Sequence, residues 1–273
     1  MKLQSVAGGG VNKLLCALLM AGLLGGCATT GGGGGGDGSG PRTASDQTDA
    51  DRRAAVRLEL ATGYFERGQF DTALDEIKQV LQIKPGMTEA LSLRSLVYAG
   101  MGENQLAEDG FRRLLAQSPK DGDVAHNYGW FLCQRGRYRE SYEQFDAALA
   151  QPQYRAPVRT LMARGVCEAR EGQLVKAEQS LAKAFEFDPS SPVVQVNLAE
   201  VLLRQGQLER ARFYARRVNA KADQVNASSL WLELRIERRL GNAANVEELG
   251  QQLRRRFPAS AEVAALNSGR FDE

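Results

Sequence analysis

The sequence predicts an all-α, right-handed superhelical solenoid made of six helix–turn–helix units. The first observation is a fixed spacing of 34 residues, at which an aromatic residue, a glycine, an alanine and a proline recur: Tyr64, Gly68, Ala73 and Pro85 are followed by Tyr98, Gly102, Ala107 and Pro119. The second is that apolar residues between these marks repeat with helical spacing. The third is a 43% apolar composition, which is enough for a packed core only if neighbouring units stack.

A period of 34 residues with this pattern is typical of tetratricopeptide repeats. After residue 50 the period divides the chain into six repeats, at about 54–87, 88–121, 122–157, 158–191, 192–226 and 227–260. The whole repeat domain is expected to cover 51–273. The sixth repeat is degenerate, as the capping unit of a solenoid usually is. The segment after it is expected to add a short helix, Ala261–Leu266, and then to fray.

The first repeat shows how each element is predicted. Its first helix is expected over Ala54–Glu66, with an apolar stripe at every fourth position formed by Val56, Leu60 and Tyr64. Gly68 permits the tight turn that follows. Asp71 is a suitable N-cap for the second helix, because its carboxylate can accept hydrogen bonds from free amides. Pro85 ends that helix, since proline has no amide hydrogen and excludes its predecessor from helical geometry.

The N-terminus has the pattern of a lipoprotein signal. Residues 1–26 combine Lys2 and Lys13 with an apolar run from Leu14 to Leu24, which is too short to span a bilayer as a mature helix. Cys27 follows two glycines, as in a bacterial lipobox, and we expect it to be lipidated. Acyl chains on Cys27 would hold the protein on a membrane. Ala28, rather than aspartate, follows Cys27, and its resemblance to the bacterial lipoprotein sorting pattern implies the periplasmic face of the outer membrane.

Residues 27–50 are expected to form a lipid-anchored tether, because six consecutive glycines, Gly31–Gly36, cannot hold a helix or bury surface. The charge balance of the chain after the signal gives no reason to expect nucleic-acid binding. Removing Lys2 and Lys13 from the 35 Lys and Arg leaves 33, against 33 Asp and Glu.

No catalytic constellation is predicted, and an enzyme is not expected. His126 is the only histidine in the sequence, which excludes a histidine metal cluster and a relay of histidines. Cys133 and Cys167 lie in the first helices of adjacent repeats and are expected to be buried thiols. A disulfide between them is the alternative, and a Cα separation above about 7 Å would rule it out. We expect no metal, no cofactor and no small-molecule substrate.

The remaining candidate site is the concave groove, because extended peptides or partner helices lie along the first helices of such solenoids. The phase of the repeat places ten candidate partner-binding residues on this wall: Leu58, Thr62, Phe65, Leu96, His126, Asn127, Trp130, Met162, Val166 and Asn197. Phe65 and Trp130 could equally be core aromatics. The loop at 151–157 holds two residues more than the period allows, and it is expected to expose Tyr154 and Arg155.

Several stretches resemble the PilF/PilW family of type IV pilus biogenesis lipoproteins. They are HNYGWFLCQRGRYRESYEQFDAAL from His126 to Leu149, the following PQYRAPVR, and ASSLWLELRIERRLGN with LRRRFPAS near the end. The order of lipobox, tether and six repeats agrees as well. The long glycine tether and Asp223, where a closing proline is expected, depart from the family's pattern.

The resemblance implies an outer-membrane pilotin without enzymatic activity or cofactor. Such a protein binds the secretin subunit of the type IV pilus and promotes its localisation and assembly into multimers, which pilus biogenesis and twitching motility require. Asn127 and Asn197 match the slot where peptide-clamping relatives carry a backbone-holding asparagine. Two alternatives stay open: a lipoprotein of outer-membrane barrel assembly, and a scaffold for peptidoglycan enzymes.

Overall fold

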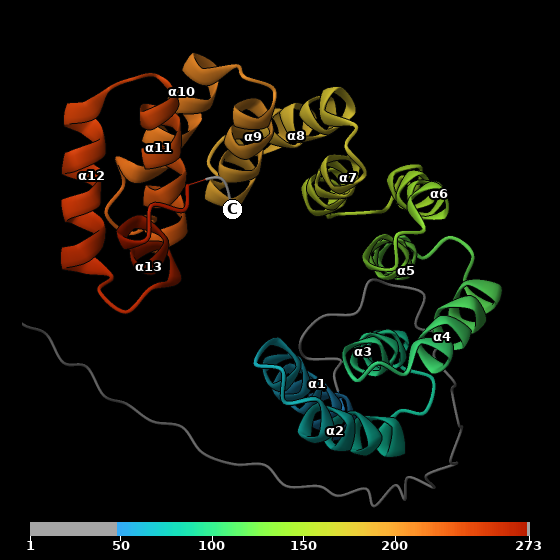
Figure 1. Ribbon diagram of the computed structural model, residues 1–273. Helices are drawn as coiled ribbons and strands as arrows, with labels where there is room; N and C mark the ends of the chain where they lie inside the picture. Colours follow the sequence, from blue (N-terminus) through green and yellow to red (C-terminus); the bar gives the residue numbers. More distant parts are fainter. Residues whose placement is uncertain (1–47, 272–273) are drawn as a thin grey trace, which may run out of the picture. The chain divides into compact units, whose positions relative to one another are not determined.

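The computed structural model describes residues 48–271, and within this range the chain forms thirteen α-helices and no strand (Figure 1). The first six helices are α1 (Asp49–Glu66), α2 (Phe70–Ile83), α3 (Thr88–Gly100), α4 (Asn104–Gln117), α5 (Gly122–Gln134) and α6 (Tyr138–Leu149). The next six are α7 (Pro157–Glu171), α8 (Leu174–Phe187), α9 (Pro192–Arg204), α10 (Leu208–Asn219), α11 (Ala227–Arg239) and α12 (Ala243–Arg256). The last is α13 (Ala261–Asn267). Each of the six predicted repeats corresponds to one helix pair, so the all-α repeat fold is confirmed.

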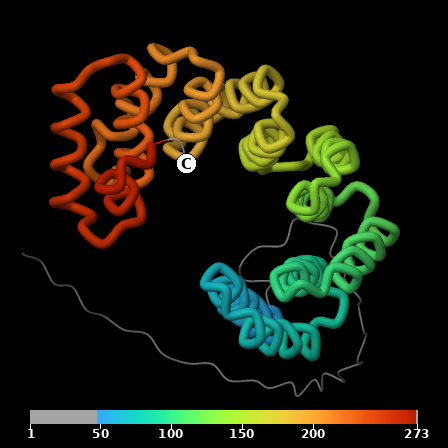
Figure 2. The backbone as a smooth tube through the Cα atoms, viewed as in Figure 1, coloured from blue at the N-terminus to red at the C-terminus, as the bar shows by residue number. Residues whose placement is uncertain are grey.

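The helices stack in a simple order. Each helix packs against the next one along the chain, as the tube in Figure 2 shows, and the first helices of adjacent repeats also touch one another, from α1 against α3 to α9 against α11. The second helices of adjacent repeats make no such contact in the described chain. The six first helices, α1, α3, α5, α7, α9 and α11, therefore form one continuous surface, here called the first-helix wall.

The turns and closures follow the repeated residues. Gly68 has a φ of +70°, a left-handed conformation that favours glycine, and the turn glycine of every later repeat repeats it. α2 ends at Ile83, two residues before Pro85. The prediction that Asp71 caps α2 is wrong. Gln69 holds the N-cap position, since its carbonyl already accepts from the amide of Ala73 at 3.0 Å, and Asp71 lies in the first turn, where the helix dipole favours a carboxylate.

The predicted stripe on the first helix is also wrong in part. Val56 and Leu60 are 54% and 47% exposed, whereas the buried positions of α1 are Ala54 and Ala61. Helical spacing alone cannot tell which side of α1 meets the stack, because no repeat precedes α1 within residues 48–271. α1 also begins at Asp49, so the expected tether, residues 27–50, overlaps the helix at its end.

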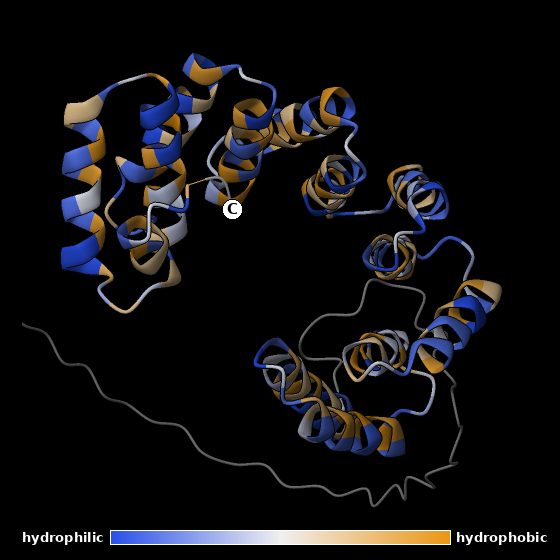
Figure 3. Cartoon of the chain, viewed as in Figure 1, coloured by the Kyte–Doolittle hydropathy of each residue, from blue (hydrophilic) through white to orange (hydrophobic). Residues whose placement is uncertain are grey.

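The apolar faces of the helices meet inside each pair (Figure 3). The third repeat shows why small residues recur at the contact. A Cβ atom on Gly129 would lie 2.8 Å from the ring of Phe145, and the buried hydroxyl of Ser141 donates to the carbonyl oxygen of Gly129 at 2.7 Å. Serine can replace the usual alanine at this position because its hydroxyl finds a partner there.

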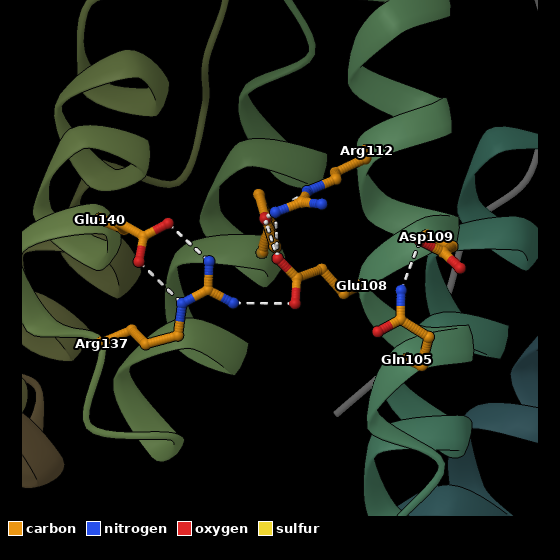
Figure 4. Close-up of polar contacts among 7 residues, drawn as sticks. Gln105, Glu108, Asp109, Arg112, Arg137 and Glu140 are labelled. Atoms are coloured by element: carbon orange, nitrogen blue, oxygen red, sulfur yellow. Dashed lines mark hydrogen bonds and ion pairs between the residues drawn. The ribbon is translucent and has the colours of Figure 1, made fainter.

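Polar side chains join the second repeat to the third (Figure 4). The Glu108 carboxylate of α4 accepts from the Tyr128 hydroxyl at 3.0 Å, from Arg137 at 2.8 Å, and pairs with Arg112 at 2.6 Å. Arg137 also holds Glu140 through two hydrogen bonds, of 2.7 and 2.5 Å. One guanidinium therefore links a helix of the second repeat to a helix of the third.

Two further predictions need correction. Cys133 and Cys167 are not free thiols but form a disulfide, with Cα atoms 5.9 Å apart, between α5 and α7. The segment after α13 does not fray at once, because Phe271 packs against Trp231 and Arg238. The short helix that precedes it, Ala261–Asn267, agrees with the prediction.

In residues 48–271 no helix has both the length and the apolar character needed to cross a bilayer. The expected signal at 1–26, Cys27 and most of the expected tether lie outside the described residues.

Candidate functional site

An apolar recess on the first-helix wall lies across the first three repeats and has a volume of about 360 Å³. We call it the N-terminal groove. Its lining comes from α1, α3 and α5, with one side chain from α7: Thr62, Phe65, Glu66, Thr88, Glu89, Ser92, Leu93, Leu96, Asp121, Asp123, Val124, Asn127 and Arg159. The groove exists because the first helices of adjacent repeats touch along part of their length and leave side chains at one edge uncovered.

Four of the ten predicted partner-binding residues meet in this groove. Phe65 and Leu96 are half-buried and form its apolar part, while Thr62 and Asn127 line it with polar groups. The Nδ2 atom of Asn127 donates to the hydroxyl of Ser92 at 3.0 Å, across the second and third repeats. This asparagine is therefore held in place at the groove, as a residue that binds a peptide backbone needs to be.

His126 does not face the groove. It is 6% exposed, and its Nδ1 atom lies 2.8 Å from the hydroxyl of Thr160, which in turn lies 2.6 Å from the hydroxyl of Tyr154. Burial, followed by the positive charge of Arg159, lowers the pKa of His126 from 6.5 to about 3. A neutral, hydrogen-bonded imidazole in this position serves packing, so the prediction that it contacts a partner is wrong for this conformation.

The same hydrogen bonds explain the loop at 151–157. Tyr154 was expected to be exposed, but its ring packs over Gly122, where an added Cβ atom would come within 2.6 Å. Its hydroxyl reaches Thr160 on the following helix. Arg155 is exposed, as predicted. The two extra residues therefore fold the loop back onto the third repeat.

The other predicted residues lie along the wall but outside the N-terminal groove. Leu58 is half-buried midway along α1, and Met162 and Val166 are half-buried on α7. Trp130 packs beside the disulfide, with the guanidinium of Arg170 at 5.3 Å from its ring. The Nδ2 atom of Asn197 donates to the carbonyl of Val193 within its own helix, at 2.8 Å.

The acidic part of the groove was not predicted from the sequence. Four carboxylates, Glu66, Glu89, Asp121 and Asp123, line it together with one guanidinium, Arg159. Asp121 caps α5 by accepting from two backbone amides, and Asp123 pairs with Arg159 at 2.7 Å. Glu66 and Glu89 are exposed and have no ion-pair partner within residues 48–271. The sequence carried one indication of this acidic part: three of the four carboxylates lie at the start of a first helix on the wall.

An apolar recess beside uncompensated carboxylates has the chemistry to bind an amphipathic segment that carries both apolar and basic side chains. The groove brings together no nucleophile and base. Across the described range, no group of three or more His, Cys, Asp or Glu side chains is placed to hold a metal ion.

Known proteins agree with this architecture. Tetratricopeptide-repeat family models match residues 58–122, 132–192 and 168–232. The type IV pilus assembly protein PilF of Pseudomonas aeruginosa is 27% identical over 226 residues, which cover 81% of this chain and 89% of PilF. The crystal structure of PilW, described as a widely conserved type IV pilus biogenesis factor, superposes with a TM-score of 0.68 at 31% identity, covering 78% of this chain and 97% of PilW.

A solved structure of Pseudomonas aeruginosa PilF has the same fold, with a TM-score of 0.64 and 24% identity, and covers 81% of this chain and all of that one. The agreement therefore runs through nearly the whole length of both relatives. Together with the repeat pattern and the ordered helix pairs, it shows that the chain belongs to the PilF/PilW family of tetratricopeptide-repeat type IV pilus biogenesis proteins.

Proposed function

We propose that this protein is a lipid-anchored pilotin that binds the secretin subunit of the type IV pilus and promotes its localisation and multimer assembly in the outer membrane. Pilus biogenesis and twitching motility would then depend on it. In this proposal the N-terminal groove captures an amphipathic secretin segment, and the acyl chains on Cys27 carry the complex to the membrane.

The observation that carries the proposal is the N-terminal groove itself. Phe65 and Leu96 offer apolar surface at a place where the stack leaves it uncovered, and Glu66 and Glu89 lie beside it without cationic partners in the described chain. Binding energy at such a surface comes from a few aromatic and aliphatic anchors, while charges at the rim set orientation and partner choice. A secretin segment with apolar residues and flanking lysine or arginine fits both features.

The disulfide supports a location outside the cytoplasm. Cys133 and Cys167 are paired, and structural disulfides persist mainly in oxidising compartments such as the bacterial periplasm. The lipobox pattern at Cys27 points to the same compartment. We therefore place the repeat domain on the periplasmic face of the outer membrane.

A complementation experiment tests the proposal. A strain lacking the gene receives the wild-type chain or a Phe65→Ala, Leu96→Ala double variant, and heat-stable secretin multimers are detected by gel electrophoresis and immunoblotting. We expect the wild type to restore multimers and twitching, and the double variant to restore neither. Leu106→Ala is the matched control, because Leu106 is an apolar residue on α4, off the wall, and 50% exposed.

Anchoring is tested separately. Cys27→Ala should leave the circular dichroism spectrum of the repeat domain unchanged and shift the protein from the outer-membrane fraction to the soluble periplasmic fraction. Normal secretin multimers in the deletion strain, or full rescue by the groove double variant with its helical content intact, would refute the pilotin proposal.

A further inference from the structure

The last described residues bind back onto the first-helix wall. After α13 the chain turns at Gly269, with a φ of +68°, and runs along α11 toward α9 (Figure 1). The Phe271 ring stacks on Trp231 with centroids 5.4 Å apart, and the Arg238 guanidinium lies 3.8 Å from the centre of the same ring. The Nε atom of Arg235 donates to the Phe271 carbonyl at 3.0 Å. We call residues 268–271 the tail.

These contacts are those of a bound peptide. An aromatic anchor is held by ring stacking and by a cation, and its main-chain carbonyl is held by a fixed guanidinium. Chain ends ordinarily fray unless something ties them down. α13 packs on both α11 and α12 and covers the last helix pair with Val263 and Leu266, and Phe271 adds its ring at the edge of the same apolar cluster. The tail instead passes α13 and lies on the surface that such solenoids use for extended ligands.

The surface around Phe271 is strongly basic. A recess of about 200 Å³ beside the ring is lined by Leu203 and four arginines, Arg204, Arg235, Arg238 and Arg239. Arg235 pairs with Glu200 of α9 at 3.1 Å, and Arg239 donates to the carbonyl of Leu203 at 2.9 Å.

The other arginines of this recess lack counter-charges. Arg204 and Arg238 are exposed, and neither has a carboxylate partner within residues 48–271. In the sequence Phe271 is followed by Asp272 and Glu273, which lie outside the described residues. An aromatic side chain followed by acidic ones is therefore the chemistry that this surface matches.

We propose that Trp231, Arg235 and Arg238, with Arg204 and Arg239 beside them, form a second peptide-binding site, and that the tail is a self-ligand that covers it. The partner is an extended protein segment in which an aromatic residue is followed by acidic residues. It binds by displacing the tail, so that its aromatic ring takes the place of Phe271. This site lies at the opposite end of the wall from the N-terminal groove and selects the opposite charge. It does not depend on which protein the groove binds.

The short connection between the tail and the site sets how strongly the tail competes with an external peptide. A self-ligand joined by a few residues competes at an effective concentration on the order of millimolar, so an external peptide of equal intrinsic affinity binds weakly while the tail is present. Removing the tail abolishes this competition. The gain on removing the tail is about one plus the effective concentration divided by the intrinsic Kd, so a matching peptide with a Kd of about 0.1 mM or lower should gain about tenfold or more in apparent affinity.

The test uses the full chain, purified in detergent, and a variant that ends after Asn267. The probe is a fluorescein-labelled peptide of sequence SGRFDE, and binding is followed by fluorescence anisotropy. We expect the shortened variant to bind the probe at least about tenfold more tightly than the full chain does. Peptides SGRADE and SGRFNQ should each lose most of this binding, and added salt should weaken it, because the proposal pairs the probe's carboxylates with the exposed arginines of the recess.

Two further variants keep the test decisive. Phe271→Ala in the full chain keeps the chain length and should also open the site to the probe. Arg238→Ala in the shortened variant should abolish probe binding with an unchanged circular dichroism spectrum, because Arg238 is an exposed residue. Equal weak binding by the full chain, the shortened variant and Phe271→Ala, or an absence of saturable binding at millimolar probe, would overturn the proposal. In that outcome the tail only caps the end of the solenoid, and a fall in melting temperature on shortening would show it.

Discussion

The two ends of the first-helix wall use the same helical frame and differ in charge and in coverage. At the N-terminal end Phe65 and Leu96 are open to a partner and carboxylates surround them. At the C-terminal end the ring of Phe271, in the chain's own tail, covers Trp231, and four arginines lie beside Phe271. A repeat array can therefore acquire distinct binding ends through a few side chains on one surface, with no change in how its helices pack.

The aromatic residues of the two ends, Trp231 and Phe65, differ most in how deeply they are packed. Trp231→Ala should lower the free energy of unfolding by about 3–5 kcal/mol, because a buried aromatic side chain is removed from the core between α11 and α12. Phe65→Ala should cost only about 1 kcal/mol, since its half-buried ring leaves no closed cavity. Urea denaturation of the full chain, followed by circular dichroism, measures both values. Equal losses would mean that the N-terminal groove is as tightly packed as the C-terminal end.

Acid should weaken the N-terminal half first. The pKa of His126 is about 3 in the folded chain and 6.5 in the unfolded one, so the unfolded state takes up a proton first as pH falls. Stability from this group is complete above pH 6.5 and declines below it, with a loss of about 2 kcal/mol at pH 5. His126→Gln should flatten the decline in urea midpoint between pH 7 and 5. At the other end, burial acts to raise the pKa of Glu237, but hydrogen bonds from Asn245 and Asn242 and the charges of nearby arginines lower it overall. The stability that Glu237 contributes is therefore lost only at lower pH than that of His126. An unchanged decline in His126→Gln would assign the acid sensitivity elsewhere.

Charge reversal should separate the two ends in binding. Glu66→Lys combined with Glu89→Lys should weaken the affinity for purified secretin subunit about tenfold, or about 1.4 kcal/mol, because both carboxylates face the proposed basic flank of the ligand. Arg204→Glu at the C-terminal end is the matched control and should leave this affinity unchanged. Surface plasmon resonance at two salt concentrations gives the comparison. If Arg204→Glu weakens secretin binding as strongly as the glutamate reversals do, the assignment of the two ends is wrong.

The helix caps of the two ends should differ only slightly, by about 1 kcal/mol or less. Capping boxes open α1, through Thr48 and Asp51, and α11, through Asn226 and Ser229. Thr48→Ala should lower the free energy of unfolding by at most about 1 kcal/mol, because α1 lies at the end of the described stack. Asn226→Ala should lower it by about 1–2 kcal/mol, because α11 packs between neighbouring helices. Thermal melts of the two variants, run beside the wild type, measure the difference. A larger loss for Thr48→Ala would show that α1 holds the array together more than its exposed face suggests.

The repeat pattern was sufficient to predict the helix pairs, for a clear physical reason. A glycine with positive φ at each turn, such as Gly68, and a proline just past a helix, such as Pro85, impose local geometry that depends little on context. The same phase placed Phe65, Leu96 and Asn127 on the wall, where they line one groove, but it also placed His126 there, which is buried.

What could not be predicted depended on neighbours rather than on local sequence. The exposure of Val56 and Leu60 follows from the absence of a repeat before α1 in the described chain, which the period of a helix does not reveal. The pairing of Cys133 with Cys167 required the distance between two helices, since the loop at 151–157 shifts the register between them. The binding of Phe271 to Trp231 joins residues 40 positions apart, and no repeat extends that far.

The disulfide joins the third and fourth repeats in the middle of the array and so separates the opening of its two arms. In an array where each repeat contacts only its neighbours, transient opening spreads inward from the ends. The bond between Cys133 and Cys167 lies in the middle, so either arm can loosen while the third and fourth repeats stay joined. Their backbone amides should exchange with solvent most slowly, and an arm that has opened closes again on a pair that is already formed. The third and fourth repeats thus remain folded while either arm reforms against them. A ligand at one binding end can therefore open that arm without opening the other.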